Sequence, residues 1–384
     1  MPEIRKVILL LATSRAHVRG LLRGIARYSR VHGPWIFYTD ASLHGKRDAL
    51  SWLKECEADG VIAPDAKENR EIIGMGLPTI VYRVGDKRVP HLPAIVADNA
   101  MIGRMAAEHL LDCAFSHFAY CGFESRPWSR QRKESFVGRI AEAGFHLDIL
   151  YTNSDLASWR SFEREQNRLI QWLKSLPNPV GLMAGNDVCG RHVIEACRIA
   201  GLQVPDQVAV IGVDNDELIC DLTDPPMSSI ALNTEKAGYE AAELLDKLIA
   251  GEKAADRDIV VRATHIATRQ STDILAAQDK TVAEAIRFIR QHAKEAIQVS
   301  DVVNYVAMSR RNLEQRFRRV LGRSIYNEIK RVRTEQIIRM LCETDLSVSE
   351  IALKLGHPSD KHIARYFKQQ AGMSLRDYRK QCRQ

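Results

Sequence analysis

Side chains that can bond to phosphates and to the edges of bases gather in two stretches near the end of the sequence. The first stretch holds Arg310, Arg311, Glu314, Gln315, Arg316, Arg318 and Arg319, and the second holds Asp360, Lys361 and Arg365. Guanidinium and amide groups form paired hydrogen bonds with base edges, and cationic groups pair with phosphates. These residue types at helical spacing indicate a nucleic-acid contact surface, although they are also typical of a solvated helix face.

The charge of the chain is concentrated in the same region. The 384 residues carry a net charge of +7, yet residues 279–384 alone contain 22 Lys and Arg against 12 Asp and Glu, which leaves residues 1–278 slightly acidic. A local excess of positive charge is expected of a module that binds phosphates. Motifs must decide whether this region is such a module, because a basic face is often only a solvated one.

Two helix-turn-helix patterns must position these side chains. From Lys280 onward, apolar residues recur at helical spacing, with no glycine before Gly322. The patterns repeat at an offset of 50 residues, so that Ser309, Leu313 and Phe317 correspond to Ser359, Ile363 and Phe367. A short helix, a tight turn and a longer basic helix are therefore predicted twice.

The outward positions of the two longer helices are expected to contact DNA in two ways. Base readout is predicted for Arg311, Glu314, Gln315, Asp360, Lys361 and Arg365, with Arg310 nearby. Phosphate contacts are predicted for Arg316, Arg318, Arg319, Lys330, Arg331 and Arg333. The alternative for each of these residues is simple exposure to solvent.

The second pattern resembles the AraC-type transcription regulators. The residues that carry the resemblance are Ile351-Ala352, Gly356-His357, Phe367-Lys368, Gly372 and Tyr378-Arg379. The chain departs from the family at His357, where phenylalanine is usual, at Leu375, where proline is usual, and at Val303, where a small residue is preferred. The resemblance covers about a hundred residues and implies a DNA-binding domain at 281–384, after a linker at 273–280.

Residues 1–272 alternate apolar runs with amphipathic stretches, which predicts βα units around a mostly parallel sheet. Strands are predicted at 7–11, 60–63, 79–82, 118–120, 181–184 and 208–212, and helices at 19–30, 103–112, 163–176 and 191–200. The carboxyl ends of such strands are expected to form a ligand site.

Several classes of protein are disfavoured by what the sequence lacks. No strand is followed by GxGxxG, and GxxxxGK[ST], HExxH, GxSxG and CxxC do not occur. No apolar run approaches the roughly 18 residues that span a bilayer, and the run at 7–12 is too short for a secretory signal. We therefore expect a cytoplasmic protein that is not an enzyme and has no cofactor, metal or membrane contact.

Four stretches resemble the effector domain of LacI-type regulators, which shares the type I periplasmic-binding-protein-like fold. They are 96–110, 132–136, 186–187 and 204–215, the last reading VPDQVAVIGVDN. The resemblance implies a two-lobed α/β effector domain at 1–272, with lobe 1 at about 1–122 and 232–256 and lobe 2 at about 123–231 and 257–272. It also implies that a sugar closes the cleft between the lobes and repositions the C-terminal helix-turn-helix units.

Candidate sugar ligands follow from the same resemblance. Sugar hydroxyls suit carboxylate, amide and guanidinium partners, and the face of a sugar ring stacks on an aromatic ring. Residues of these types at matching positions are Trp128, Arg132, Asn186, Asp187 and Asp214. Asp98 either joins them or caps the helix that follows it. Ser14, Arg15 and Asp65 follow predicted strands and either line the cleft or belong to ordinary turns.

The order of the two domains resembles that of the family of xylose operon regulators. This implies a sugar-responsive transcription activator of pentose catabolism genes, with D-xylose or a related aldose as effector. It also implies double-stranded operator DNA, a second copy of the chain and RNA polymerase as partners. The alternatives are a sugar-binding protein, a regulator that responds to another sugar or sugar derivative, and an enzyme on a Rossmann-like sheet, which the missing glycine motif disfavours.

Overall fold

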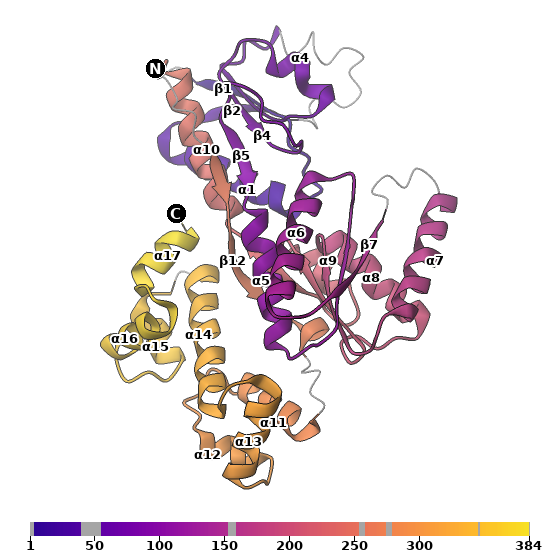
Figure 1. Cartoon of the computed structure of the whole chain (residues 1–384). Helices are drawn as coiled ribbons and strands as arrows, with labels where there is room; N and C mark the ends of the chain where they lie inside the picture. Colours follow the sequence, from indigo (N-terminus) through magenta and orange to yellow (C-terminus); the bar gives the residue numbers. More distant parts are fainter. Residues whose placement is uncertain are drawn as a thin grey trace. The chain divides into compact units, whose positions relative to one another are not determined.

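The computed structural model describes residues 4–39, 55–152, 159–252, 258–273, 279–344 and 346–383 (Figure 1). The chain divides into two compact units. Unit 1 comprises Met1–Met101, Glu124–Arg132 and Leu232–Ala263, and unit 2 comprises Ile102–Phe123, Lys133–Ala231 and Thr264–Gln384. Among the described residues, no helix is long and apolar enough to cross a membrane, and no group of His, Cys, Asp and Glu is arranged to hold a metal ion.

The centre of unit 1 is a six-stranded sheet in the order β11-β5-β4-β3-β1-β2. Its strands are β1 (Arg5–Leu9), β2 (Trp35–Thr39), β3 (Gly60–Pro64), β4 (Thr79–Tyr82), β5 (Ala94–Ala97) and β11 (Ile259–Val261). All five pairings are parallel. Parallel strands are covered on both faces, which explains why the inner ones read as continuous apolar runs.

Helices α1 (Ala16–His32) and α10 (Thr234–Ile249) of unit 1 pack closely through glycines (Figure 1). A Cβ atom on Gly24 would lie 1.9 Å from the backbone oxygen of Glu235, and one on Gly238 would lie 2.0 Å from that of Leu21. Larger residues would push the helices apart, because backbone atoms cannot move aside as side chains do. The buried faces of both helices join the strands in one hydrophobic core.

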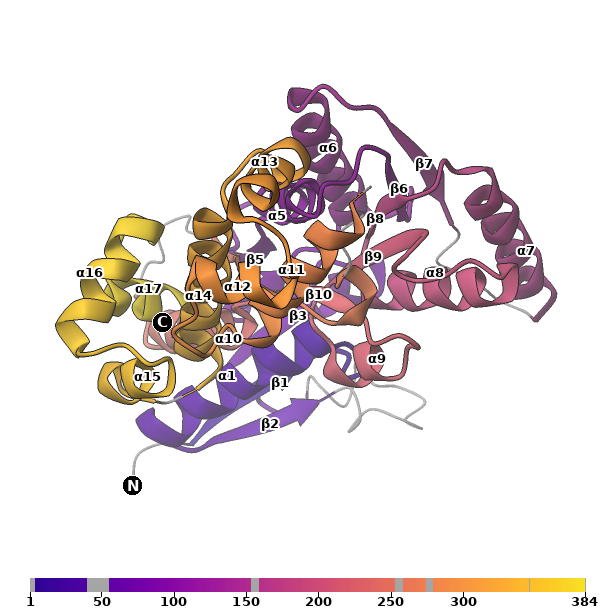
Figure 2. The same cartoon turned by 90° about the horizontal axis from the view of Figure 1, so that it is seen from below.

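Unit 2 contains a second six-stranded sheet, in the order β12-β10-β9-β8-β6-β7. Its strands are β6 (Phe118–Gly122), β7 (Leu147–Tyr151), β8 (Val180–Ala184), β9 (Val208–Val213), β10 (Ser228–Leu232) and β12 (Ala263–Ala267). Its helices are the end of α5 (Asn99–Asp112), the end of α6 (Pro127–Glu142), α7 (Trp159–Ser175), α8 (Asp187–Ala200) and α9 (Glu217–Asp221), followed by the 3-10 turn η2 (Gln270–Thr272). Helices α7 and α8 lie side by side (Figure 2).

The strand pairing differs from the predicted lobe boundaries at two places. Strand β6 pairs with β7 and β8 in the second sheet, whereas residues up to 122 were expected in lobe 1. Strand β11 pairs with β5 in the first sheet, whereas residues from 257 onward were expected in lobe 2. The apolar pattern of a strand does not indicate which of two similar sheets it joins. Strands β2, β5, β7, β10, β11 and β12 and helices α6 and α10 were not predicted.

The C-terminal part of unit 2 is all-helical, as the sequence predicts. Its helices are α11 (Lys280–Gln291), α12 (Val299–Tyr305), α13 (Arg310–Leu321), α14 (Ile325–Glu343), α15 (Val348–Lys354), α16 (Asp360–Ala371) and α17 (Leu375–Arg383). Helix α14 is shared by two cores: its first half packs with α11, α12 and α13, and its second half packs with α15, α16 and α17 (Figure 1).

Candidate functional site

The side chains of Trp128 and Arg132 meet on one face of α6, because residues four apart are neighbours on a helix. The guanidinium carbon of Arg132 lies 4.9 Å from the centre of the Trp128 ring. Arg132 is 5% exposed, and its Nε donates a hydrogen bond to Asn99 Oδ1 at 3.0 Å. Asn99 in turn donates to Gln131 Oε1 at 2.8 Å. These residues of unit 1 form an aromatic and cationic cluster, in which Asn99 and Gln131 were not predicted.

The other candidates of unit 1 have local roles or remain exposed. Asp98 accepts a hydrogen bond from the backbone N–H of Met101 at 3.0 Å, which is the helix-capping alternative for this residue. Asp65 Oδ1 accepts from the backbone N–H groups of Val84 at 2.7 Å and Gly85 at 3.1 Å, and so holds the loop after β4. Ser14 and Arg15 are exposed in the turn before α1.

Asp187 is the centre of a buried hydrogen-bond network in unit 2. Its side chain accepts from Ser229 Oγ at 2.6 Å and from the backbone N–H of Asp216 at 2.7 Å, and the residue is 2% exposed. A Cβ atom on Gly212 would lie 2.2 Å from Asp187 Oδ1, so glycine is required there. Burial, and after it the charge of Asp214, raise the pKa of the Asp187 carboxyl well above its ordinary value. These contacts favour a role in positioning the loop after β9.

That loop carries Asp214 in a strained conformation. Asp214 is half-buried and has a φ of +104°, which residues other than glycine rarely adopt. The next residue, Asn215, is held by Ser229 Oγ at 3.0 Å and by Arg269 Nη1 at 3.0 Å. Strain of this kind is common in ligand-binding loops. Asn186, in contrast, caps α8 by accepting from the Cys189 N–H at 3.0 Å.

The two helix-turn-helix patterns have the same local structure at the offset of 50 residues. Ser309 caps α13 and Ser359 caps α16, each by accepting a hydrogen bond from the third backbone N–H of its helix. The predicted core positions Leu313, Phe317, Ile363 and Phe367 are fully buried. The repeat also extends further than predicted. Gly322 and Gly372 end the helices with positive φ, and Ser324 and Ser374 precede α14 and α17.

The side chains predicted to contact bases or phosphates are mostly exposed on α13 and α16. Exposed members of the set are Arg310, Arg311, Gln315, Arg318, Arg319, Asp360, Lys361 and Arg365. Glu314 is half-buried, and its Oε2 atom has no hydrogen-bond partner among the described residues. Gln315 and Arg365 occupy equivalent positions of the two helices, 50 residues apart.

Some arginines that were expected to contact phosphates instead form hydrogen bonds and ion pairs with other residues of the protein. Arg316 donates to both carboxylate oxygens of Asp279 at 3.1 and 3.2 Å, and Arg319 lies 3.6 Å from the same carboxylate. Asp279 also caps α11 and is nearly buried.

Two further arginines, on α14, are turned toward protein groups. Arg333 donates to the backbone oxygens of Glu295 and Leu355, at 3.0 and 2.7 Å. The prediction that Arg331 contacts phosphates is wrong, because its guanidinium group is surrounded by carboxylates and belongs to an ion-pair cluster and not to an open basic face. Glu328 and Glu335 lie three and four residues from Arg331 on the same helix, a spacing that could have indicated these ion pairs, whereas Asp112 is more than 200 residues away.

Comparisons with known proteins identify both parts of the chain. Residues 107–272 match the periplasmic binding protein-like domain, and residues 302–381 match a helix-turn-helix domain. The xylose operon regulatory protein of Haemophilus influenzae is 32% identical over 386 residues, which cover 98% of each chain. The protein of the same name from Escherichia coli K12 is 29% identical over 97% of this chain and 96% of the relative. A solved structure of the xylose-binding transcription activator xylR covers 100% of both chains at 27% identity, with a TM-score of 0.63.

Proposed function

Because the chain belongs to the family of xylose operon regulatory proteins, we propose that xylose is its effector and that it activates genes of pentose catabolism. The chain is a DNA-binding transcription regulator with a sugar-binding type of effector domain, and not an enzyme. The observation that carries the proposal is the presence, in one chain, of this effector domain and of two helix-turn-helix units with matching exposed positions.

The proposed sugar contacts come from Arg132, Trp128 and Asp214. A guanidinium group donates to vicinal hydroxyls, a carboxylate accepts from them, and an indole ring stacks on the face of a pyranose. Four other candidates are proposed to act indirectly. Asp187 and Asp65 accept hydrogen bonds from backbone N–H groups of neighbouring loops. Asn186 and Asp98 accept from N–H groups in the first turns of the helices that follow them. A sugar that binds one conformation of the effector domain more tightly than others shifts the chain toward that conformation, which is the proposed switch.

The proposed DNA complex uses α13 and α16 in successive segments of the major groove, roughly 34 Å apart. Base contacts are proposed for the exposed residues Arg311, Gln315, Lys361 and Arg365. A cytoplasmic homodimer that contacts RNA polymerase completes the proposal. Its support is the likeness to a transcription activator over the whole chain.

The test is the thermal unfolding of the full-length protein in the presence of xylose, arabinose, ribose, glucose or allose. A sugar at 100 times its dissociation constant stabilises the folded state by about 2.7 kcal/mol, which shifts the unfolding temperature by several degrees. We expect a shift with xylose and a much smaller one with the other sugars. The Arg132→Ala variant, whose affinity for xylose should be lower, serves as the matched control and should show a clearly smaller shift. Equal shifts with several sugars, or a shift with another sugar alone, would contradict xylose as the effector.

A further inference from the structure

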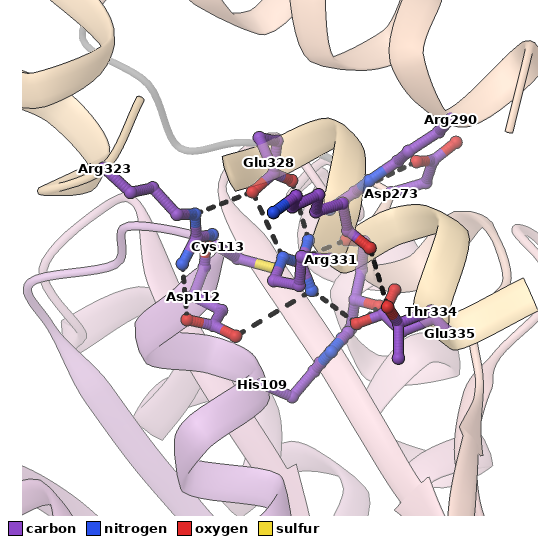
Figure 3. Close-up of polar contacts among 12 residues, drawn as sticks. His109, Asp112, Cys113, Asp273, Arg290, Arg323, Glu328, Arg331, Thr334 and Glu335 are labelled. Carbon is purple, nitrogen blue, oxygen red and sulfur yellow. Dashed lines mark hydrogen bonds and ion pairs between the residues drawn. The ribbon is translucent and has the colours of Figure 1, made fainter. Parts of the chain in front are cut away.

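A cluster of ion pairs joins the end of α5 in the effector domain to α14 in the DNA-binding domain, both within unit 2 (Figure 3). Arg323 Nη1 donates to Asp112 Oδ1 at 2.8 Å, and Arg323 Nη2 donates to the backbone oxygen of Asp112 at 3.1 Å. Arg331 Nη1 lies 3.8 Å from Asp112 Oδ2. One carboxylate of the effector domain therefore contacts two arginines of the DNA-binding domain.

Glu328 fixes both arginines from the side of α14. Its carboxylate is 1% exposed and accepts from Arg323 Nε at 2.6 Å and from Arg331 Nη2 at 2.8 Å. Burial by itself raises the pKa of Glu328, but the hydrogen bonds and charges of the two arginines outweigh it, so the pKa lies below its ordinary value. A second carboxylate, Glu335, also pairs with Arg331. The arginine side chains are thus already oriented toward Asp112.

The charge of Asp112 is unfavourable for its own helix, and within the described part of the chain its compensating contacts come from the DNA-binding domain. Asp112 is the last residue of α5, where the helix dipole disfavours negative charge and where backbone oxygens lack partners within the helix. Arg323 supplies both a positive charge and a hydrogen-bond donor to that backbone oxygen. The presence of an aspartate at position 112 is therefore explained by its contact with the DNA-binding domain and not by the stability of α5.

Two further contacts tie the same domains together. Arg290 of α11 donates to Asp273 Oδ1 at 2.7 Å, next to the end of η2. The hydroxyl of Tyr378 in α17 donates to the backbone oxygen of Thr264 in β12 at 3.3 Å. The Asp112 cluster differs from these in acting on α14, whose buried residues belong to the cores of both helix-turn-helix units.

Hydrogen bonds also connect α5 to the loop-positioning network of the effector domain. His109, one turn before Asp112, bonds Thr272 Oγ1 at 2.9 Å, and Thr272 Oγ1 donates to Ser228 Oγ at 2.7 Å. The neighbouring Ser229 bonds Asp187. Ser228 Oγ also accepts from the backbone N–H of Arg269 at 2.8 Å, and Arg269 Nη1 donates to Asn215 Oδ1 at 3.0 Å. The polar contacts that begin one turn before Asp112 therefore reach the loop of Asp214.

We propose that Asp112 is a positioning residue, which fixes α14 to the effector domain through Arg323 and Arg331 and thereby makes DNA binding depend on the sugar. The dependence on sugar rests on the proposed function. Ion pairs suit such a contact, because they are directional and hold α14 in one orientation relative to α5.

The test compares Asp112→Asn with Glu108→Gln in the full-length protein. Glu108 is a matched control, because it lies one turn earlier on α5 and its partners Arg104 and Arg139 belong to the effector domain. The measured quantity is the ratio of dissociation constants without and with xylose, for a duplex selected for binding by the unaltered protein. We expect Asp112→Asn to reduce this ratio by about tenfold while the affinity for xylose by calorimetry changes less than twofold, and Glu108→Gln to preserve both. An unchanged ratio in Asp112→Asn would overturn the proposal.

A double-substitution cycle tests the contact itself, independently of the effector. We compare the unfolding temperatures of Asp112→Asn, Arg323→Lys and the double variant. Lysine keeps the positive charge but cannot form the bidentate contact of arginine. The double variant should unfold close to the less stable single variant. Fully additive shifts would overturn the role of Asp112 even if xylose is not the effector. If only the sugar response of the unaltered protein is absent, the proposed function fails while the contact stands.

Discussion

The guanidinium group of Arg132 lies over the ring of Trp128, at 4.9 Å from its centre. The pair results from helical spacing in α6, and the bond from Arg132 to Asn99 fixes the guanidinium plane. A buried cation next to an aromatic face is suited to bind the hydroxyls and the ring of a sugar at the same time.

Arg132→Ala should weaken xylose binding by about 10- to 100-fold, because charge-assisted hydrogen bonds contribute about 1.5–3 kcal/mol. It should also destabilise unit 1 by about 1–3 kcal/mol, since Asn99 Oδ1 loses its buried donor. Titration calorimetry and urea unfolding measure the two effects. Arg139→Ala is the control on the same helix. Arg139 pairs with the exposed carboxylates of Glu108 and Glu142, and exposed ion pairs contribute little to stability. A dissociation constant unchanged by Arg132→Ala would remove this residue from the site.

Asp187 and Asp214 should respond differently to substitution. Asp187→Ala leaves the hydroxyl of Ser229 and the N–H of Asp216 without their acceptor, so we expect a loss of about 2–4 kcal/mol in the free energy of unfolding. Asp214→Asn keeps the shape of the side chain and should lower xylose affinity while changing stability by less than about 1 kcal/mol. Urea unfolding and calorimetry on both variants separate the roles. A stable Asp187→Ala protein would contradict the positioning role.

The free energy of unfolding should decrease as the pH is lowered from neutrality, partly because of His109. Burial, and after it the charges of Arg290 and Arg331, lower the pKa of His109 to about 3, so the folded chain keeps it neutral where the unfolded chain protonates it. The stabilising contribution is complete above pH 6.5 and is lost as the pH falls toward 3, by up to about 1.4 kcal/mol per pH unit.

Substitution measures the share of His109 in this slope. Burial also lowers the pKa values of His192 and His357 to about 4, so part of the slope should remain in His109→Gln. Urea midpoints at pH 7, 6 and 5 should show a shallower decline in His109→Gln than in the unaltered protein, whereas the exposed His146→Gln should keep the full slope. Parallel declines in all three proteins would contradict the assignment.

Arg365→Ala should reduce binding to the selected DNA by about 10- to 100-fold and relax preference at one base pair, because a guanidinium contact to a base contributes about 1–3 kcal/mol. Gln315→Ala, at the equivalent position of α13, should affect the other half of the site. Competition binding with selected and random duplexes measures both. An equal loss on the two kinds of duplex would indicate that Arg365 contacts phosphates.

The sequence was sufficient for the features that depend on local order. Helical spacing, serine caps and the offset of 50 residues predicted the two helix-turn-helix units, and their buried positions Leu313, Phe317, Ile363 and Phe367 agree with the structure. Trp128 and Arg132 meet because a helix brings residues four apart together, although α6 itself was not predicted. Such features need only the neighbouring few residues, which is why a pattern reveals them.

Only the tertiary structure decided which distant side chains become neighbours. Arg331 has helical spacing to Glu328 and Glu335, but its third carboxylate, Asp112, comes from a segment more than 200 residues away. Asp187 has the chemistry of a sugar ligand, yet Ser229 and Asp216 occupy its oxygens. The placement of β6 and β11 in their sheets likewise depends on pairings with strands elsewhere in the chain. Burial and ion pairing depend on which chain segments pack together, and this is set by the three-dimensional fold and not by the local order of residues.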